Sequence, residues 1–209
     1  MRIGLLGGSF NPAHEGHVHI SRQALARLGL DAIWWVVSPQ NPLKQADGMA
    51  PFAERLAAAR KIAGGDPRIV VTDIEARLGT RYTIDTMQAL LTCFPENRFV
   101  WIMGADILAE FPRWKNWRSL FGMVSIAVFD RAPYSMKARA GEAARCFASK
   151  RTAARHARKL ADRQPPAWTY FSIPLHPATA TKLRAAQTCR TNLMTPRSVY
   201  RNFKEIQDR

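Results

Sequence analysis

GGSFNPAHEGH, residues 7–17, separates an apolar run at 3–6 from an amphipathic run at 18–28 in a chain of 209 residues. This order predicts a strand, a tight turn and a helix. The glycines at 7 and 8 carry no Cβ, so we expect them to accept φ > 0 and to let a bound group come close. Unpaired N–H groups and the helix dipole favour an anion at the start of the helix. The two imidazoles of the stretch are then expected to face that anion.

Each part of this stretch has an ordinary explanation when it stands alone, because a glycine pair or a lone histidine is common in strand–helix turns. The complete arrangement, with His14 and His17 at the start of the helix, favours a binding site. On one face of the expected helix, apolar residues recur every four positions and would pack on a sheet: Ile20, Ala24 and Leu28. A metal site built from His14, His17 and His19 is disfavoured, because no carboxylate or cysteine accompanies them.

The charge of the chain is strongly positive, with 31 Lys and Arg against 16 Asp and Glu and a net charge of +15. Nucleic acids, anionic membranes and phosphorylated small molecules would all be attracted to such a surface. Residues 131–163 hold ten of the basic residues and two of the acidic ones, so this segment carries +8 of the total. The excess is therefore local and lies away from the glycine-rich turn.

The sequence shows no basic leader followed by an apolar core, and no apolar run of about 18 residues. Its three cysteines, Cys93, Cys146 and Cys189, lie far apart and form no CxxC pair. This spacing favours reduced thiols and disfavours a zinc site. We therefore expect a cytoplasmic protein without a signal peptide, a membrane anchor or a membrane partner.

Apolar runs of strand length alternate with helix-forming segments along the chain. The expected strands are 3–6, 32–38, 68–72, 98–103, 124–129 and 168–173, and the expected helices include 51–63, one from about 82 to 93, and two basic helices within 135–163. Such alternation predicts an α/β fold with a doubly wound parallel sheet and helices on both faces. The length predicts a single domain, 1–209, with a basic helical insertion at 131–163 and a small C-terminal helical extension at 179–209.

Several polar side chains follow expected strands, at the edge where an open parallel sheet binds ligands. Lys44 follows the second strand and would be either a solvated loop lysine or a phosphate contact. Asp106 follows the fourth strand and would either accept hydrogen bonds from ribose hydroxyls or cap the next helix. Thr83 or Asp85 is expected to cap the helix that ends near residue 93.

Two tryptophans, Trp114 and Trp117, stand three residues apart, which is helical spacing and favours packing in a core. The residues between and before them are polar or turn-forming, which favours a partly exposed aromatic side chain. Both interpretations remain open from position alone.

Residues 7–17 resemble the first signature of the nucleotidyltransferase superfamily, commonly G-G-S-F-D-P-x-H-x-G-H, with Asn11 at the position where Asp is usual. Asn11 keeps a turn-forming side chain and loses a charge, a change that we expect to be tolerated. Residues 179–184, TATKLR, resemble the second signature, I-S-S-T-x-[IL]-R, although Ala180 removes one hydroxyl. The resemblance implies a Rossmann-like fold and transfer of a nucleotidyl group from a nucleoside triphosphate, with release of pyrophosphate. The missing hydroxyl implies weaker contact with ATP.

Four further blocks make the chain similar to the family of bacterial nicotinate-nucleotide adenylyltransferases: SPQNPLK at 38–44, RYTIDT at 81–86, GAD at 104–106 and FPRW at 111–114. The resemblance covers about residues 1–134 and 168–187. It implies that AMP passes from ATP to nicotinate mononucleotide, giving deamido-NAD and pyrophosphate in NAD biosynthesis. Mg²⁺ is implied as the companion of ATP.

The same resemblance implies which residues bind each substrate, with His14 and His17 as the catalytic residues. It implies ATP contacts at Gly7, Gly8, Ser9, Phe10, His14, His17, Thr179, Thr181 and Arg184. It implies mononucleotide contacts at Ser9, Lys44, Thr83, Asp106, Trp114, Lys115 and Arg131. In the family the pyridine ring stacks on the tryptophan that matches Trp114, and a pyridinium cation does favour an aromatic face. Backbone N–H groups near Thr83 and Lys115 are implied to hold its carboxylate, and no residue is expected to bind a metal ion.

Two other functions remain as alternatives. A sister adenylyltransferase acting on another phosphorylated acceptor, such as phosphopantetheine, would share both signatures but would have no reason to keep Trp114. A basic nucleic-acid-binding protein would explain the charge, but the basic segment lacks interleaved aromatic residues for base stacking, so we expect no nucleic-acid partner. The sequence leaves open the choice between nicotinate and nicotinamide mononucleotide, the purpose of the basic segment, and whether the chain forms a homo-oligomer.

Overall fold

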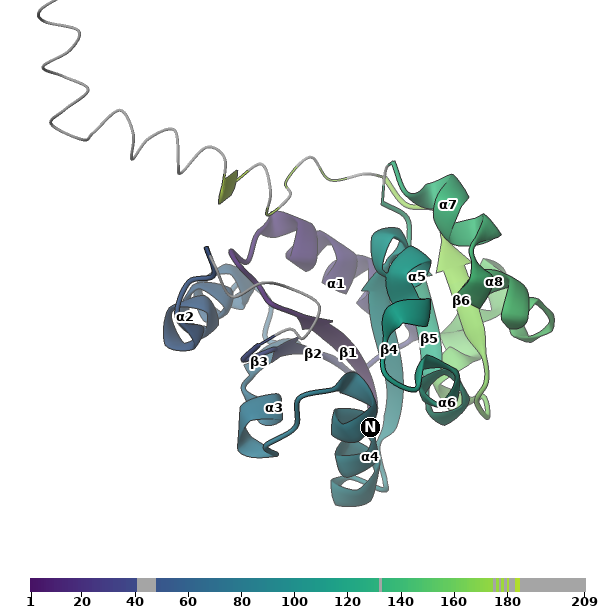
Figure 1. Cartoon of the computed structure of the whole chain (residues 1–209), viewed down its shortest axis with the longest axis horizontal. Helices are drawn as coiled ribbons and strands as arrows, with labels where there is room; N and C mark the ends of the chain where they lie inside the picture. The colour runs from purple at the N-terminus through teal and green to yellow at the C-terminus, as the bar shows by residue number, and fades with distance from the viewer. Residues whose placement is uncertain are drawn as a thin grey trace, which may run out of the picture.

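The structure is a computed structural model that describes residues 1–40, 48–131 and 133–174, together with 176, 178, 180, 183 and 184. Strands and helices alternate through these residues (Figure 1). The strands are β1 (Arg2–Gly8), β2 (Ala32–Val37), β3 (Ile69–Thr72), β4 (Arg98–Gly104), β5 (Ser125–Phe129) and β6 (Trp168–Phe171). The α-helices are α1 (Glu15–Leu28), α2 (Phe52–Ala63), α3 (Ile74–Arg77), α4 (Thr83–Cys93), α5 (Ala105–Glu110), α6 (Trp117–Met123), α7 (Ser135–Ala140) and α8 (Glu142–Cys146), and the 3-10 helices are η1 (Phe111–Arg113), η2 (Ala148–Lys150) and η3 (Ala154–Asp162).

These strands form one six-stranded sheet in the order β3-β2-β1-β4-β5-β6, and all the pairings between them are parallel. The expected doubly wound parallel α/β fold is thus confirmed. The strand order reverses between β1 and β4, and an open α/β sheet binds its ligands at such a reversal, outside the carboxyl ends of the strands. The glycine-rich turn after β1 and the segment after β4 both start at that point.

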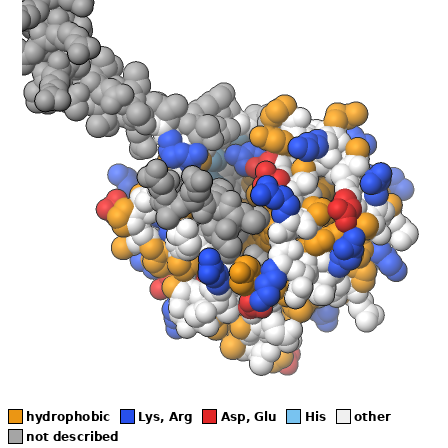
Figure 2. Space-filling view, viewed as in Figure 1, with side chains coloured by type: hydrophobic (Ala, Val, Ile, Leu, Met, Phe, Trp, Pro, Cys, Tyr) orange, Lys and Arg blue, Asp and Glu red, His pale blue; other side chains and the backbone are white. Residues whose placement is uncertain are grey.

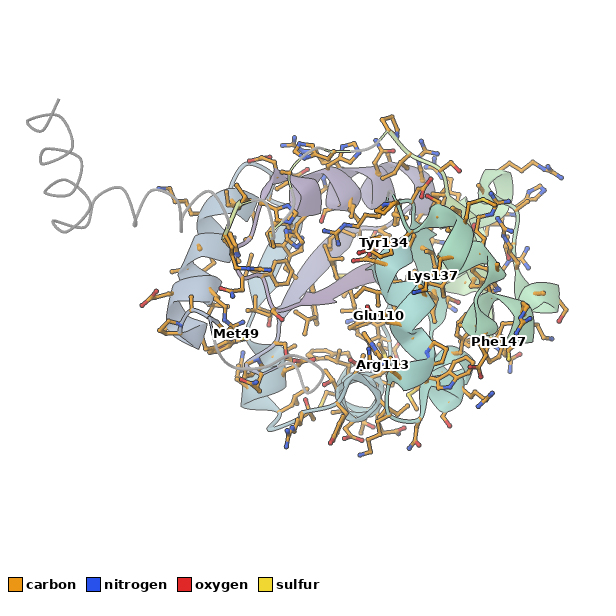
Figure 3. All side chains as sticks on the ribbon, turned by 45° about the horizontal axis from the view of Figure 1, so that its top comes forward. Met49, Glu110, Arg113, Tyr134, Lys137 and Phe147 are labelled. Carbon is orange, nitrogen blue, oxygen red and sulfur yellow. The ribbon has the colours of Figure 1, made fainter. Side chains whose placement is uncertain are left out.

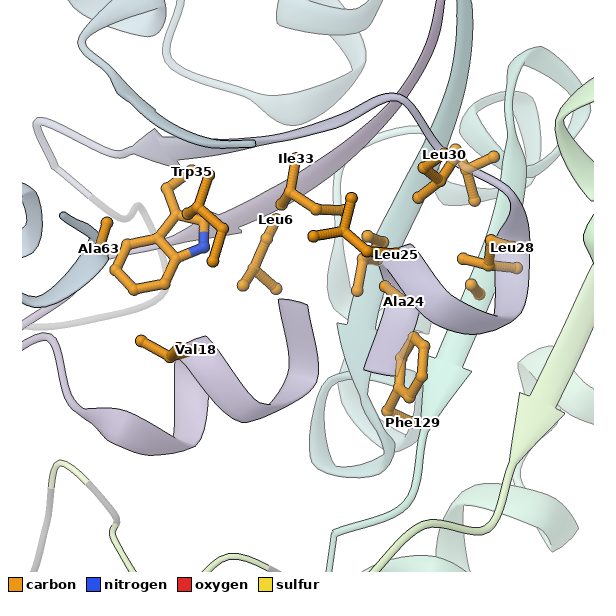
Figure 4. Packing of buried hydrophobic residues seen from close by; sticks show 14 of the residues in the cluster. Leu6, Val18, Ala24, Leu25, Leu28, Leu30, Ile33, Trp35, Ala63 and Phe129 are labelled. Carbon is orange, nitrogen blue, oxygen red and sulfur yellow. The ribbon is translucent and has the colours of Figure 1, made fainter. Parts of the chain in front are cut away.

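Both faces of the sheet are covered, which is why its inner strands are largely apolar after their first residues. On one face α1, α2 and η3 bury a cluster that includes Leu6, Leu28, Trp35 and Phe129; Figure 4 shows the part of this cluster beside α1. On the other face α4, α5, α6, α7 and α8 bury a second cluster. Alternation along β1 divides the strand between the two, since Leu5 belongs to the second cluster and Leu6 to the first.

Two helix starts differ from the sequence expectation. Helix α1 begins at Glu15 rather than at residue 18, because the His14 side chain caps it by accepting a hydrogen bond from the Gly16 N–H. Helix α4 begins at Thr83, and its N-cap residue is Tyr82. The expectation that Thr83 or Asp85 would cap this helix is wrong, because both already lie inside its first turn.

The basic segment also differs from expectation. Two basic helices were predicted within 135–163, whereas the structure has α7, α8, η2 and η3. Gly141 separates α7 from α8 with an extended backbone (ψ 165°), and near residue 152 the chain leaves the helical path to pair with β6, where the Thr152 N–H donates to the Trp168 carbonyl over 2.7 Å. Pairing with the sheet therefore overrides the helix propensity of this Ala- and Arg-rich sequence. Figure 2 shows that Lys and Arg side chains are spread over the visible face of the molecule.

Of the expected C-terminal extension at 179–209, only residues 180, 183 and 184 are described, and they are helical. In the part of the chain that the structure covers, no helix has both the length and the apolar character needed to cross a membrane.

Candidate active site

A cavity of about 470 Å³ opens at the carboxyl ends of β1 and β4, where the strand order reverses. Its volume is in the range of small-molecule sites. Met49 lines it from the α2 side and Arg113 from the side of α5 and α6 (Figure 3). The cavity brings together most of the predicted site residues: Gly7, Gly8, Ser9, Phe10, His14, His17, Thr83, Asp106, Trp114, Lys115, Arg131 and Arg184. The remaining three, Lys44, Thr179 and Thr181, lie outside the described residues.

The two histidines of the turn hold each other in place at the start of α1. The Gly16 N–H donates to His14 Nδ1 over 3.1 Å, and the His14 N–H donates to His17 Nδ1 over 3.2 Å. Their ring centroids are 3.9 Å apart. Since each Nδ1 accepts a hydrogen bond, the proton of each neutral ring is on Nε2. Both rings thus offer an N–H donor from a fixed position.

His14 acts as a neutral donor rather than as a cation. Burial lowers the pKa of His14 to about 4, and the positive charges of Arg131 and His176 act in the same direction. At neutral pH the ring is therefore uncharged. It can still donate one hydrogen bond from Nε2 to a phosphate oxygen, without a change in protonation.

Four buried polar side-chain atoms have no hydrogen-bond partner among the described residues: Ser9 Oγ, His14 Nε2, Trp101 Nε1 and Asp106 Oδ1. All four belong to residues that line the cavity. A buried polar atom without a partner costs about 1–3 kcal/mol, so native proteins keep few of them. Their concentration in one cavity indicates a site shaped for a polar ligand that supplies the missing partners.

The turn itself differs from the expectation in one respect. Gly7 and Gly8 lie in β1 and are not among the positive-φ residues, so the expectation of φ > 0 at these positions is wrong. The left-handed residue is Phe10, with φ 46°, and its ring stacks on Trp35 with centroids 5.0 Å apart. Gly7 is needed for space, because a Cβ there would lie 2.5 Å from the ring of Trp101. The group that the structure places close to Gly7 is therefore the ring of Trp101.

The side chain of Asn11 explains why asparagine suits this position of the turn. Its Nδ2 donates to the Gly48 carbonyl over 3.2 Å, and its Oδ1 accepts from the Ala50 N–H over 3.2 Å. A carboxylate could make only the second of these bonds. From the C-terminal side, Arg184 Nη1 donates to the Asn11 carbonyl over 2.6 Å. The described end of the second signature therefore meets the first signature directly.

Asp106 lies inside the first turn of α5 and makes no capping hydrogen bond there, so the interpretation of Asp106 as a helix cap is wrong. Its Oδ2 accepts from Arg131 Nη1 over 2.8 Å, while Oδ1 is one of the four buried atoms without a partner. Asp106 and Arg131 thus form an ion pair on the cavity wall, with one carboxylate oxygen left to accept from a ligand.

The far end of the cavity combines an aromatic face with a helix N-terminus. Trp114 is half-buried and packs on Phe111, with centroids 5.0 Å apart. Trp117 is buried in the core, so the two tryptophans divide between site and packing. Lys115 forms an ion pair of 3.2 Å with Asp85 and lies 4.5 Å above the ring of Tyr82. These contacts attach the loop after η1 to the start of α4, whose first N–H groups lack partners within the helix.

Three residues of this region could not be recognised as functional from the sequence: Trp101, Glu75 and Arg55. Trp101 stands within an apolar strand, and its indole N–H is the feature of the sequence that indicates a polar role. Glu75 follows a strand and is 6% exposed, so it resembles a surface acid in the sequence but lies in the cavity wall. Burial raises the pKa of Glu75 to about 7, and hydrogen bonds with Ser38 and Thr86 act in the opposite direction.

Glu75→Gln should make folding stability less dependent on pH. The folded protein keeps the Glu75 proton up to about pH 7, whereas the ordinary pKa is 4.5, so stability falls as the pH rises between these values. The loss is on the order of 3 kcal/mol at most. Glutamine cannot ionise, so the variant should gain stability relative to the wild type between pH 5 and pH 8. Urea unfolding of both proteins at the two pH values measures this gain, and an unchanged difference would contradict the raised pKa.

The chain belongs to the cytidylyltransferase-like family, whose model matches residues 5–184. Within it, a probable nicotinate-nucleotide adenylyltransferase from Parvibaculum lavamentivorans is 52% identical over 184 residues, which cover 88% of this chain and 91% of that protein. A protein of the same name from Gluconobacter oxydans is 53% identical over 184 residues, 88% of this chain and 94% of that protein. These similarities confirm the family resemblance seen in the sequence motifs and the assignment to nucleotidyl transfer.

A solved structure shares the fold. Plasmodium falciparum nicotinic acid mononucleotide adenylyltransferase complexed with NaAD aligns with a TM-score of 0.66 at 16% identity, covering 88% of this chain and 82% of that one. At this identity the likeness supports the α/β architecture.

Proposed function

We propose that this chain transfers AMP from ATP to nicotinate mononucleotide, giving deamido-NAD and pyrophosphate. One observation carries the proposal: the two signature segments meet at a cavity whose wall holds all four buried polar atoms that lack partners in the described chain. The relatives that share about half of their sequence with this chain carry the name of the same activity.

In the proposed reaction an oxygen of the mononucleotide phosphate forms a bond to the α-phosphorus of ATP. The bond from that phosphorus to the oxygen bridging the α- and β-phosphates breaks, and its electron pair leaves with pyrophosphate. The attacking phosphate is already ionised, so no general base is required. The protein has to align the two substrates and stabilise the negative charge that moves to the leaving group.

ATP is assigned to the half of the cavity formed by the first signature. His14 and His17 would donate from Nε2 to phosphate oxygens, because Nδ1 of each ring accepts a backbone N–H. Arg184 would offset charge from the second signature. Three predicted site residues lie outside the described residues: Thr179, Thr181 and Lys44. Their roles stay those that the resemblance implies, with ATP contacts for the two threonines and a mononucleotide contact for Lys44.

Mg²⁺ is assigned to the ATP that carries it rather than to a site of the protein. Among the described residues, no group of three or more His, Cys, Asp or Glu could hold a metal ion. The phosphate oxygens of ATP are the hard ligands that Mg²⁺ prefers, and the ion would neutralise part of their charge.

Nicotinate mononucleotide is assigned to the other half of the cavity. Its pyridine ring would stack on Trp114, and its carboxylate would lie at the start of α4, near the N–H groups of Thr83 and Ile84. N–H donors and the helix dipole favour a carboxylate over the neutral amide of nicotinamide mononucleotide. Asp106 Oδ1 and Arg131 would bind ribose hydroxyls and phosphate, respectively.

A direct assay tests the proposal: pyrophosphate release from ATP and Mg²⁺ with nicotinate mononucleotide, nicotinamide mononucleotide or phosphopantetheine in parallel reactions. We expect kcat/KM for the nicotinate form to exceed that for the nicotinamide form by 10-fold or more, since a charge-assisted hydrogen bond is worth about 1.5–3 kcal/mol. Release with phosphopantetheine alone would support the sister activity. Absence of release with all three acceptors would reject the proposal.

A further inference from the structure

Arg55 joins three segments of the chain that lie far apart in sequence. It is the fourth residue of α2 and is 2% exposed. Its guanidinium donates to four backbone carbonyls, at 2.5 Å to Ser9, 2.8 Å to Ser38, 2.7 Å to Pro39 and 2.9 Å to Ala50. These carbonyls belong to the turn after β1, the end of β2 and the approach to α2. Only a planar group with several diverging N–H donors can bind all of them at once.

This placement is unfavourable for stability on its own. A cation near the start of a helix opposes the helix dipole, and burial lowers the pKa of Arg55 because it penalises the charged form. Within the described chain, the ion pairs do not include Arg55, so its partners there are peptide carbonyls and the ring of Phe52, 5.5 Å from the guanidinium carbon. The four hydrogen bonds to backbone carbonyls offset this cost, and an apolar side chain would leave these carbonyls without that donor. The position of Arg55 therefore indicates that these backbone segments need to be held in a fixed arrangement.

The segments that Arg55 joins lie side by side in the cavity wall, where the Ser38 N–H donates to the Gly8 carbonyl over 2.9 Å. Ser9 and Ser38 both line the cavity. Ser9 belongs to the turn assigned to ATP, and Ser38 contacts Glu75 on the side that leads to α4. In a trans peptide the C=O and the following N–H point in opposite directions, so fixing the Ser9 carbonyl directs the Phe10 N–H away from Arg55. Arg55 thus extends the pairing of β1 and β2, which ends at Gly8 and Val37, by holding the two segments that follow these strands.

The same junction is held from a second direction by Asn11. Its side chain bonds Gly48 and the N–H of Ala50, while Arg55 takes the carbonyl of Ala50. The residues before and after the segment 41–47 are therefore pinned to the glycine-rich turn by two independent side chains. Their combined effect is to fix the turn, the end of β2 and the start of α2 as one unit.

We propose that Arg55 is a positioning residue for nucleotidyl transfer, holding the ATP-binding turn in register with the end of β2 that borders the acceptor. The inference rests on the proposed function. Arg55 touches neither substrate; it acts through the backbone of Ser9, Ser38 and Pro39. Its loss should therefore disturb the alignment of two bound substrates more than the binding of either one.

The experiment compares Arg55→Met and Arg55→Lys with the wild type. Pyrophosphate release gives kcat, and calorimetry gives Kd separately for the Mg²⁺ complex of a non-hydrolysable ATP analogue and for nicotinate mononucleotide. Because a misplacement of about 1 Å can cost about 10²-fold, we expect kcat of Arg55→Met to fall by about that factor while each Kd changes less than about threefold. Arg55→Lys keeps the charge but loses the planar set of N–H donors, so its kcat should lie between those of Arg55→Met and the wild type.

Arg68→Met is the matched control. Arg68 forms an ion pair with Asp66 through two hydrogen bonds, of 3.0 and 2.9 Å. The pair lies just before the first residue of β3, at the end of that strand opposite the cavity. Its loss should lower the melting temperature and leave kcat near the wild-type value. If Arg55→Met fails to fold, Arg55→Lys decides the question.

The outcomes separate the two proposals. A wild type that releases no pyrophosphate with any acceptor rejects the proposed function. A wild type that is active, together with folded Arg55 variants whose kcat is unchanged, rejects the positioning role alone. Weakened binding of one substrate that accounts for the whole loss of activity also rejects it, as does a fully active Arg55→Lys.

Discussion

Replacement of His17 by alanine should lower kcat for pyrophosphate release by about 10²- to 10³-fold, the cost of removing one hydrogen-bond donor from a site of developing negative charge. His17 lines the cavity, and its Nδ1 accepts from the His14 N–H, so Nε2 is the atom presented to phosphate oxygens. The variant also loses this capping contact, which is worth on the order of 1 kcal/mol of stability. Steady-state kinetics at saturating ATP, with a thermal melt of each protein, measures both effects.

His19→Ala is the control for His17→Ala. It lies on the same helix, but its Nε2 is 2.9 Å from the Pro174 carbonyl and it does not line the cavity. We expect His19→Ala to keep a kcat close to the wild type. A folded His17→Ala protein with nearly normal turnover would show that His17 does not contact the reacting phosphates.

Replacement of Trp114 by alanine should raise KM for nicotinate mononucleotide with little change in KM for ATP. Stacking of a base on an aromatic side chain is worth about 1–3 kcal/mol, which corresponds to an increase of about 5- to 150-fold. The pyridinium charge adds a cation–π contribution that alanine cannot supply. Initial rates with each substrate varied in turn separate the two KM values.

Trp114→Phe should retain part of this affinity, because a phenyl ring still offers an aromatic face. Trp114 packs on Phe111 with one part of its ring and is half-buried, whereas Trp117 is the buried member of the pair. Equal increases in both KM values for Trp114→Ala would indicate a general disturbance of the cavity and would contradict the assigned stacking.

The sequence predicted the architecture well because the pattern is local and repeated. Apolar runs covered on both faces, such as 32–37, alternate with amphipathic helices, and this alternation forces parallel pairing. It did not predict the form of the basic segment. The Thr152 N–H pairs with Trp168, sixteen residues away, and a contact of this kind has no local sequence signal.

The candidate site could be predicted where its residues occur in the two signatures, and it could not be predicted where tertiary packing creates the environment. The spacing of His14 and His17 placed both rings at a helix start. Nothing in the sequence distinguishes Glu75 or Arg55 from surface residues, because their burial depends on segments elsewhere in the chain. The left-handed residue was assigned to the wrong positions, because glycine is the usual choice and Phe10 takes that conformation through its stacking on Trp35.

The hydrogen bonds behind His17 have a consequence for mutational tolerance. The indole of Trp35 donates to Ser21 Oγ over 2.8 Å, and Ser21 Oγ donates to the His17 carbonyl over 2.9 Å. Trp35 and Ser21 are fully buried, so the backbone of a histidine that lines the cavity is connected to the middle of β2. The core residue Trp35 and the cavity residue His17 are therefore linked through Ser21. A substitution at Trp35 is therefore expected to move the His17 backbone as well as to change the packing volume of the core.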